Sequence, residues 1–117
     1  MKDLYERNPA PRKTVVLLNA DHFHFNDNIE QSHDGFKMLM GAMANGEDAS
    51  PEIATMVEQM KPSSELTPGE HAYRMINGLG LARFDATLRG SADAAAILDS
   101  DLVALMAEHS IAVEVWQ

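Results

Sequence analysis

The chain is poor in the residues that support redox chemistry and nucleic-acid binding. None of its 117 residues is cysteine, which excludes disulfides, thiolate metal ligands and thiol nucleophiles. Only 9 residues are Lys or Arg, against 18 Asp and Glu, so the formal net charge is −9. A surface this acidic repels phosphate backbones, and we therefore expect no direct binding to nucleic acid.

Long apolar runs and glycine-based ligand motifs are absent as well. No uninterrupted apolar stretch reaches membrane-spanning length, and the N-terminal MKDLYERNPAPRK is too polar for a secretory signal. We therefore expect a cytoplasmic protein with no membrane contact. The sequence also lacks a P-loop, a G-x-S-x-G elbow and a dinucleotide-binding glycine pattern, so it carries no strong catalytic motif.

The apolar content is sufficient for one domain of ordinary size, since 45% of the residues are hydrophobic. Residues 1–12 are predicted to form an N-terminal arm, because Pro9 and Pro11 disfavour both helix and central strand. Residues 13–117 are predicted to form a single α/β domain. Residues 1–13 hold four basic and two acidic residues, a charge of +2, whereas the remainder of the chain carries −11.

Three segments of the sequence have the pattern of strands. The stretch KTVVLLNADHFHFND, residues 13–27, contains four consecutive apolar residues, which is typical of a strand covered on both faces. Apolar residues alternate with polar ones in LARFDATL (81–88), which predicts a second strand. A third strand is predicted for IAVEVW (111–116), where alternate residues are again apolar.

Helices are predicted between these strands. Asp27, Ser50 and Thr67 each begin a pattern typical of a helix start, in which a proline or a capping-box glutamate follows. Gly78 and Gly80 are expected to end the third helix, and two short helices are expected between residues 92 and 109. Helices between successive strands imply crossover connections and parallel pairing. The predicted fold class is therefore α/β, with a small, mostly parallel three-stranded sheet in the order β-ααα-β-αα-β, flanked by helices.

The last third of the chain, RFDATLRGSADAAAILDSDLVALMAEHSIAVEVW, resembles the second half of DsrE-like sulfur-relay domains. The resemblance is one of pattern: a strand ending in a small-residue turn, a helix, and then a leucine-rich helix, a small loop and an alternating strand. It implies a small α/β oligomer. It does not imply sulfur transfer, because active members of the family place a cysteine after strands of this kind and this chain has none.

A ligand site is predicted at the end of the first strand. Asp21, His22, His24 and His33 are its candidate residues, because ligands usually bind beyond the carboxyl ends of parallel strands. On a strand, His22 and His24 would share one face and could both bind a single divalent metal ion, with Asp21, Asp27 or His33 completing the site. The alternative is that these histidines only make hydrogen bonds at the strand end.

The methionines and the single tryptophan indicate where a partner could bind. Eight residues are methionine, a side chain that fills core gaps and also adapts to partner surfaces. Exposure of Met38 together with Leu39 would favour a subunit interface. Trp116 is expected to be exposed unless a helix or a partner covers it.

Two functions from different classes remain open on this basis. The first is a small acidic, non-enzymatic binding or regulatory protein that acts through homo-oligomerisation or a protein partner, and that needs no cofactor. The alternative is a small metal-dependent hydrolase in which His22 and His24 bind the metal and Asp21 or His33 assists. The absence of a strong catalytic motif favours the first.

Overall fold

The structure, a computed structural model, describes residues 2–7, 9 and 12–117. The chain divides into two compact units. The terminal unit consists of Met1–Leu18 and Arg74–Gln117, and the middle unit consists of Asn19–Tyr73. Residues 13–117, predicted as a single domain, therefore contribute to both units.

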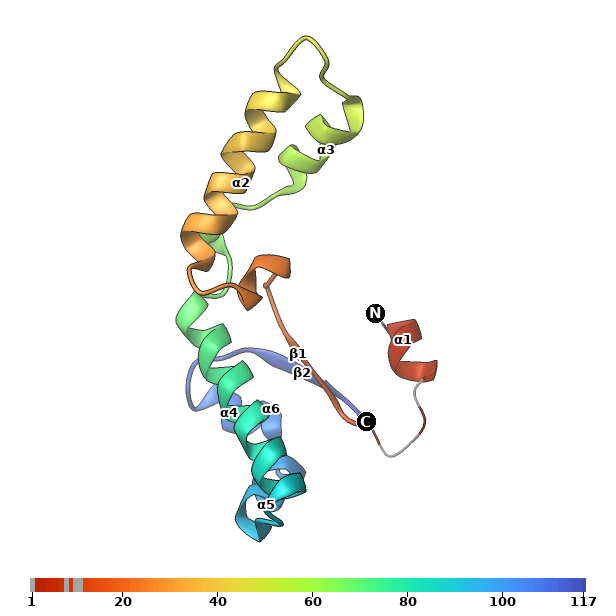
Figure 1. The fold of residues 1–117 in the computed structure, drawn as a ribbon, viewed down its shortest axis with the longest axis vertical. Coiled ribbons are helices and arrows are strands. Elements are labelled where there is room, and N and C mark those ends of the chain that lie inside the picture. Colours follow the sequence, from red (N-terminus) through yellow and green to blue (C-terminus); the bar gives the residue numbers. More distant parts are fainter. Residues whose placement is uncertain (1, 8, 10–11) are drawn as a thin grey trace. The chain divides into compact units, whose positions relative to one another are not determined.

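The terminal unit contains the only sheet formed by the described residues, and this sheet contradicts the predicted fold class. Strand β1 (Thr14–Leu17) pairs with β2 (Val113–Trp116) in antiparallel orientation (Figure 1). Thr14 lies opposite Trp116 and Leu17 lies opposite Val113. The prediction of a mostly parallel three-stranded sheet is therefore wrong: the described residues form two strands and are otherwise mainly helical.

The segment predicted as the second strand is helical. Residues 81–88 form the end of α4 (Gly69–Leu88), a helix of 20 residues. Buried positions recur at helical spacing along α4, with Ala72, Met75 and Ala82 all buried, whereas the apolar alternation that suggested a strand leaves Phe84 exposed. Leu, Ala and Arg are strong helix formers, and glycine within a helix costs only about 1 kcal/mol relative to alanine, so Gly78 and Gly80 do not end the helix.

The core of the terminal unit lies where the sheet meets the helices. Its buried members are Met75, Met106, Ile111 and Val113, with Val15 and Leu17 of β1 packed against them. Helix α5 (Ala92–Asp99) begins after Ser91, whose hydroxyl accepts a hydrogen bond from the Ala94 amide at 3.2 Å. Helix α6 (Leu102–Ala107) is capped in the same way by Asp101.

The predicted N-terminal arm contains a helix, α1 (Lys2–Arg7), while Pro11 lies outside the described residues. The ring of Tyr5 contacts that of Trp116 edge-on, with 5.9 Å between the ring centres. Tyr5 is buried and Trp116 is half-buried. A helix of the same chain therefore covers part of the tryptophan, which was one of the two arrangements expected for it.

The middle unit is a helical hairpin with two short 3₁₀ turns. Helix α2 (Ile29–Ala44) packs against α3 (Pro51–Gln59), as Figure 1 shows. The turns are η1 (His22–Phe25) and η2 (Ser63–Glu65). The Ser50 cap of α3 is confirmed, since its hydroxyl accepts a hydrogen bond from the Ile53 amide at 3.2 Å. Helix α2 begins one residue later than predicted, with Asn28 at the cap position.

Ile111 provides a test of this fold in the terminal unit, because its side chain is fully buried between the sheet and α6. We expect Ile111→Ala to lower the free energy of unfolding of this unit by about 2–5 kcal/mol. Trp116 is the single tryptophan and lies in β2, so its fluorescence during urea titration reports this unit. The exposed Val103→Ala variant is the control and should differ from wild type by no more than about 0.5 kcal/mol. Equal stability of the two variants would contradict the described core.

Candidate functional site

Asp21 is the residue around which the loop after β1 folds. Its carboxylate oxygen Oδ1 accepts a hydrogen bond from the Phe23 amide at 2.9 Å, and its own amide donates to Nδ1 of His24, also at 2.9 Å. This reciprocal pair is a capping box in which a histidine takes the place usually held by glutamate or glutamine. The pair fixes residues 22–25 as a 3₁₀ turn, so they do not continue the strand.

His24 is buried and uses both of its ring nitrogens. Nδ1 accepts the hydrogen bond from the Asp21 amide, and Nε2 lies 2.8 Å from the carbonyl oxygen of Thr67. Because a carbonyl oxygen only accepts, Nε2 must be the donor in this bond. Nδ1 also lies 3.1 Å from Oδ1 of Asp21. This arrangement leaves no nitrogen lone pair of His24 for a metal ion.

His33 joins α2 to the same carboxylate. Its side chain is buried, and Nε2 donates a hydrogen bond to the carbonyl oxygen of Lys61 at 2.6 Å. Nδ1 lies 2.5 Å from Oδ2 of Asp21, a close contact whose geometry is not that of a good hydrogen bond. Asp21 therefore contacts both buried histidines, one through each carboxylate oxygen.

Three of the four predicted site residues thus come together, and the fourth does not. The buried His24 and His33 and the half-buried Asp21 form one polar cluster, whereas His22 is exposed and makes none of these contacts. The predicted geometry, with His22 and His24 on one face of a strand, is wrong because β1 ends at Leu17. Within the part of the chain that the structure describes, no group of three or more His, Cys, Asp and Glu is placed to hold a metal ion. The cluster connects the loop to α2 and to the segments before α4.

Two exposed carboxylates of α2 strengthen these connections. Oε1 of Glu30 accepts a hydrogen bond from the Gly69 amide at 2.9 Å, and this bond lowers the pKa of Glu30 below its usual range. Asp34 accepts bonds from the hydroxyl and the amide of Ser63, at 2.6 and 3.0 Å, and they lower the pKa of Asp34. Gly69 is needed for this close approach, because a Cβ there would lie 2.1 Å from Cγ2 of Ile29.

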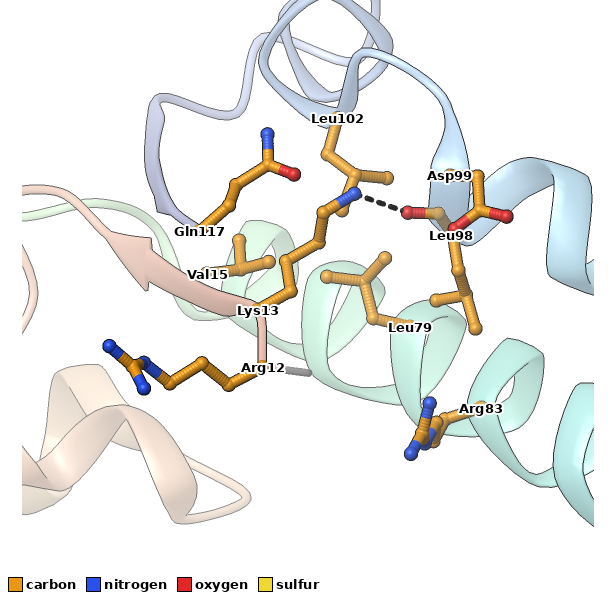
Figure 2. Close-up of a pocket in the computed structure, with 9 residues that line it drawn as sticks. All are labelled: Arg12, Lys13, Val15, Leu79, Arg83, Leu98, Asp99, Leu102 and Gln117. Atoms are coloured by element: carbon orange, nitrogen blue, oxygen red, sulfur yellow. Dashed lines mark hydrogen bonds between the residues drawn. The ribbon is translucent and has the colours of Figure 1, made fainter. Parts of the chain in front are cut away.

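A cavity of about 700 Å³ lies in the terminal unit, between the start of β1 and helices α4 and α5 (Figure 2). Four aliphatic side chains line it: Val15, Leu79, Leu98 and Leu102. Its polar lining consists of Arg12, Lys13, Arg83, Asp99 and Gln117. Three of the nine basic residues of this acidic chain therefore border one cavity.

The cations of the cavity differ in what they contact. Nζ of Lys13 donates a hydrogen bond to the carbonyl oxygen of Leu98 at 2.5 Å, in the last turn of α5. The guanidinium of Arg12 lies over the ring of Tyr5, 4.5 Å from its centre, and Figure 2 shows it directed away from the Lys13 ammonium. Arg83 is exposed on α4 and has no hydrogen bond or ion pair with any described residue.

The exposed residues in the second half of α2 are apolar. We call the surface that they form with Gly35 the α2 outward face and define it by five exposed residues: Gly35, Met38, Leu39, Ala42 and Met43. Their spacing of three, one, three and one residues places them on one face of the helix. Met38 is 76% exposed, Leu39 58% and Met43 49%. Met38 and Leu39 are therefore exposed together, the arrangement that we expected to favour a subunit interface.

Comparisons with family models, with curated proteins and with solved structures give no significant match to this chain. No helix among the described residues is long and apolar enough to cross a membrane. The cavity and its cations were missed in the sequence. The basic excess of residues 1–13 was the available signal, but only the pairing of β1 with β2 brings Lys13 next to α5.

The histidine cluster predicts different effects on stability for substitutions of two nearby histidines. His24→Ala should lower the free energy of unfolding of the middle unit by about 2–4 kcal/mol, because it removes the hydrogen bonds of the buried imidazole to the Asp21 amide and the Thr67 carbonyl. His22→Ala should change it by no more than about 0.5 kcal/mol, since His22 is exposed. Urea titration followed by the amide NMR signals of α2 measures both. A metal site at His22 and His24 would instead give equal losses of bound zinc in the two variants.

Glu30 predicts a defined pH dependence. Because its pKa is lowered in the folded state, its contribution to stability is complete above its ordinary pKa of 4.5 and is lost as the pH falls through the lowered value. We expect Glu30→Gln to be less stable than wild type at pH 7 and to approach wild type toward pH 3. Urea unfolding at several pH values measures this difference, with the exposed Glu58→Gln as control. A difference that stays constant with pH would contradict the role of the Gly69 bond.

Proposed function

We propose that the chain is a non-enzymatic binding protein that acts by docking its α2 outward face on another protein surface, and that the first occupant of this face is a second copy of the chain. The main support for this proposal is that every exposed residue of α2 from Gly35 to Met43 is apolar. Single exposed apolar side chains are ordinary, but a contiguous patch is typical of an interaction site.

The chemistry of the face supports helix-to-helix packing. Met38, Leu39 and Met43 supply flexible, polarisable side chains that adapt to a partner. Gly35 and Ala42 lie beside them and are small, which allows a second helix to approach closely. No charged side chain interrupts the face, whereas the neighbouring Asp34 is turned to Ser63.

Gly35 gives independent support. A Cβ at this position would have no atom within 4 Å, so nothing inside the described chain requires a glycine there. Glycine in a helix interior costs about 1 kcal/mol relative to alanine. A glycine at the N-terminal end of the exposed apolar face leaves room there for a partner helix to approach closely.

A second copy of the chain suits this face because the face is self-complementary: apolar, uncharged and carried on one straight element, as a two-fold symmetric contact requires. The net charge of −9 on each copy opposes the association. Added salt screens this repulsion, so self-association should tighten as ionic strength rises. Binding to a basic partner protein would show the opposite salt dependence.

The alternative of a metal-dependent hydrolase gains no support from the geometry. Both ring nitrogens of His24 are engaged by the main chain, and His22 lies outside the cluster. Asp21 and His33 contact each other, and their hydrogen bonds to the main chain go to the Phe23 amide and the Lys61 carbonyl. The binding function is therefore the one proposed.

The test is the molar mass of the full chain in solution, measured by light scattering over a range of concentrations at low and at high salt. We expect a dimer that Leu39→Glu converts to a monomer, because the variant places a charge in the centre of the face. Val103→Glu is the matched control, since Val103 is 46% exposed and lies on α6 of the other unit. It should remain dimeric. A wild-type chain that stays monomeric up to millimolar concentration would overturn self-association.

The Gly35→Ala variant distinguishes an effect on dimerisation from an effect on folding stability. In the dilute, dissociated protein this variant should be about as stable as wild type or up to about 1 kcal/mol more stable, because alanine favours the helix. It should nevertheless dimerise more weakly, because the added methyl group holds the second helix away. Unchanged dimerisation would show that the helices do not approach at Gly35.

A further inference from the structure

We propose that the cavity of the terminal unit binds a small anionic amphiphile, a carboxylate carried on a short aliphatic chain. The proposal concerns a different part of the molecule from the α2 outward face and does not depend on it. Its basis is the combination of an aliphatic lining with cations inside one cavity of a strongly acidic chain (Figure 2).

The apolar part of the ligand is indicated by the walls. Val15 comes from β1, Leu79 from α4 and Leu102 from α6, so three elements contribute aliphatic side chains to one space. A volume of about 700 Å³ lies within the range of about 300–1,000 Å³ usual for small-molecule sites. An alkyl chain that enters this space removes apolar surface from water on both sides of the contact.

The charged part of the ligand is indicated by Lys13 and Arg83. The ammonium of Lys13 uses one donor on the Leu98 carbonyl, which leaves two of its three donors for a ligand. That bond also holds the ammonium at the edge of the cavity. Arg83, which has no partner among the described residues, offers a planar donor pair that matches a carboxylate.

The balance of charge favours a monoanion. The guanidinium of Arg12 is directed away to the Tyr5 ring (Figure 2). Two cations, Lys13 and Arg83, therefore remain beside the one negative charge of Asp99, a balance of 2 − 1 = +1. A second cavity shares Lys13 and Asp99 and adds Asp101, so acidic groups lie immediately beyond the cations. A group with several negative charges would meet these carboxylates, and the net charge of −9 on the chain would also repel it. A single carboxylate satisfies the cations with the least repulsion.

The experiment is an NMR titration of the full chain with octanoate, followed at the amides of residues that line the cavity. We expect saturable shifts at these amides, and an affinity for 1-octanol at least tenfold weaker, because the alcohol has the same chain without the charge. Octyl phosphate tests the headgroup and should bind more weakly than octanoate. Absence of shifts at the cavity with octanoate would overturn the proposal, and tighter binding of octyl phosphate would overturn the assignment of a carboxylate.

Variants of the cations complete the test. Arg83→Gln should weaken octanoate binding at least fivefold while leaving 1-octanol binding unchanged, and it should fold normally because Arg83 is exposed and without a partner among the described residues. Arg89→Gln is the matched control: it removes an exposed cation directly after α4 that does not line the cavity and that pairs with the half-buried Asp85. It should bind octanoate as wild type does. Equal octanoate affinity in wild type and Arg83→Gln would overturn the role of the cations.

Discussion

The antiparallel pairing of β1 with β2 determines how the terminal unit is built. Four residues near each end of the chain form this ladder, from Thr14 opposite Trp116 to Leu17 opposite Val113. The pairing places Val15 and Leu17 against the buried Ile111 and so closes the core. It also places Lys13, which directly precedes β1, beside the last turn of α5. The cationic cavity therefore exists only because two segments far apart in sequence meet in this register.

The middle unit relies more on buried polar contacts than on a large apolar core. Ile29 and Ala72 are its buried apolar side chains, and the buried imidazoles of His24 and His33 accompany them. Every ring nitrogen of these histidines contacts either the main chain or the Asp21 carboxylate. Hydrogen-bonded polar groups in a small interior specify one arrangement of the loops. They also leave the outward side of α2 uninvolved in folding, and it is this side that the proposed docking uses.

The sequence predicted local features better than non-local ones. Ser50 was predicted correctly as a helix cap, because its signal lies within a few residues. Residues 81–88 were predicted as a strand because an alternating pattern over eight residues also fits part of a long helix; here the helix formers of α4 prevailed. The histidine pair was misplaced because the strand ends at Leu17 and a turn with positive φ at Asn19 follows. Asp21 then caps a 3₁₀ turn that contains both histidines. The cavity depends on strand pairing between the chain ends, which no local pattern encodes.

Methionine methyl groups offer a direct view of the proposed docking surface. Met38 and Met43 lie on the α2 outward face, whereas Met75 and Met106 are buried in the core of the terminal unit. We would label the methionine methyl groups with ¹³C and record their NMR signals as the protein concentration is raised. Docking through the α2 outward face predicts concentration-dependent shifts of Met38 and Met43, with Met75 and Met106 unchanged. Unchanged signals of Met38 and Met43 at concentrations where the chain has associated would contradict it, because the contact would then lie elsewhere.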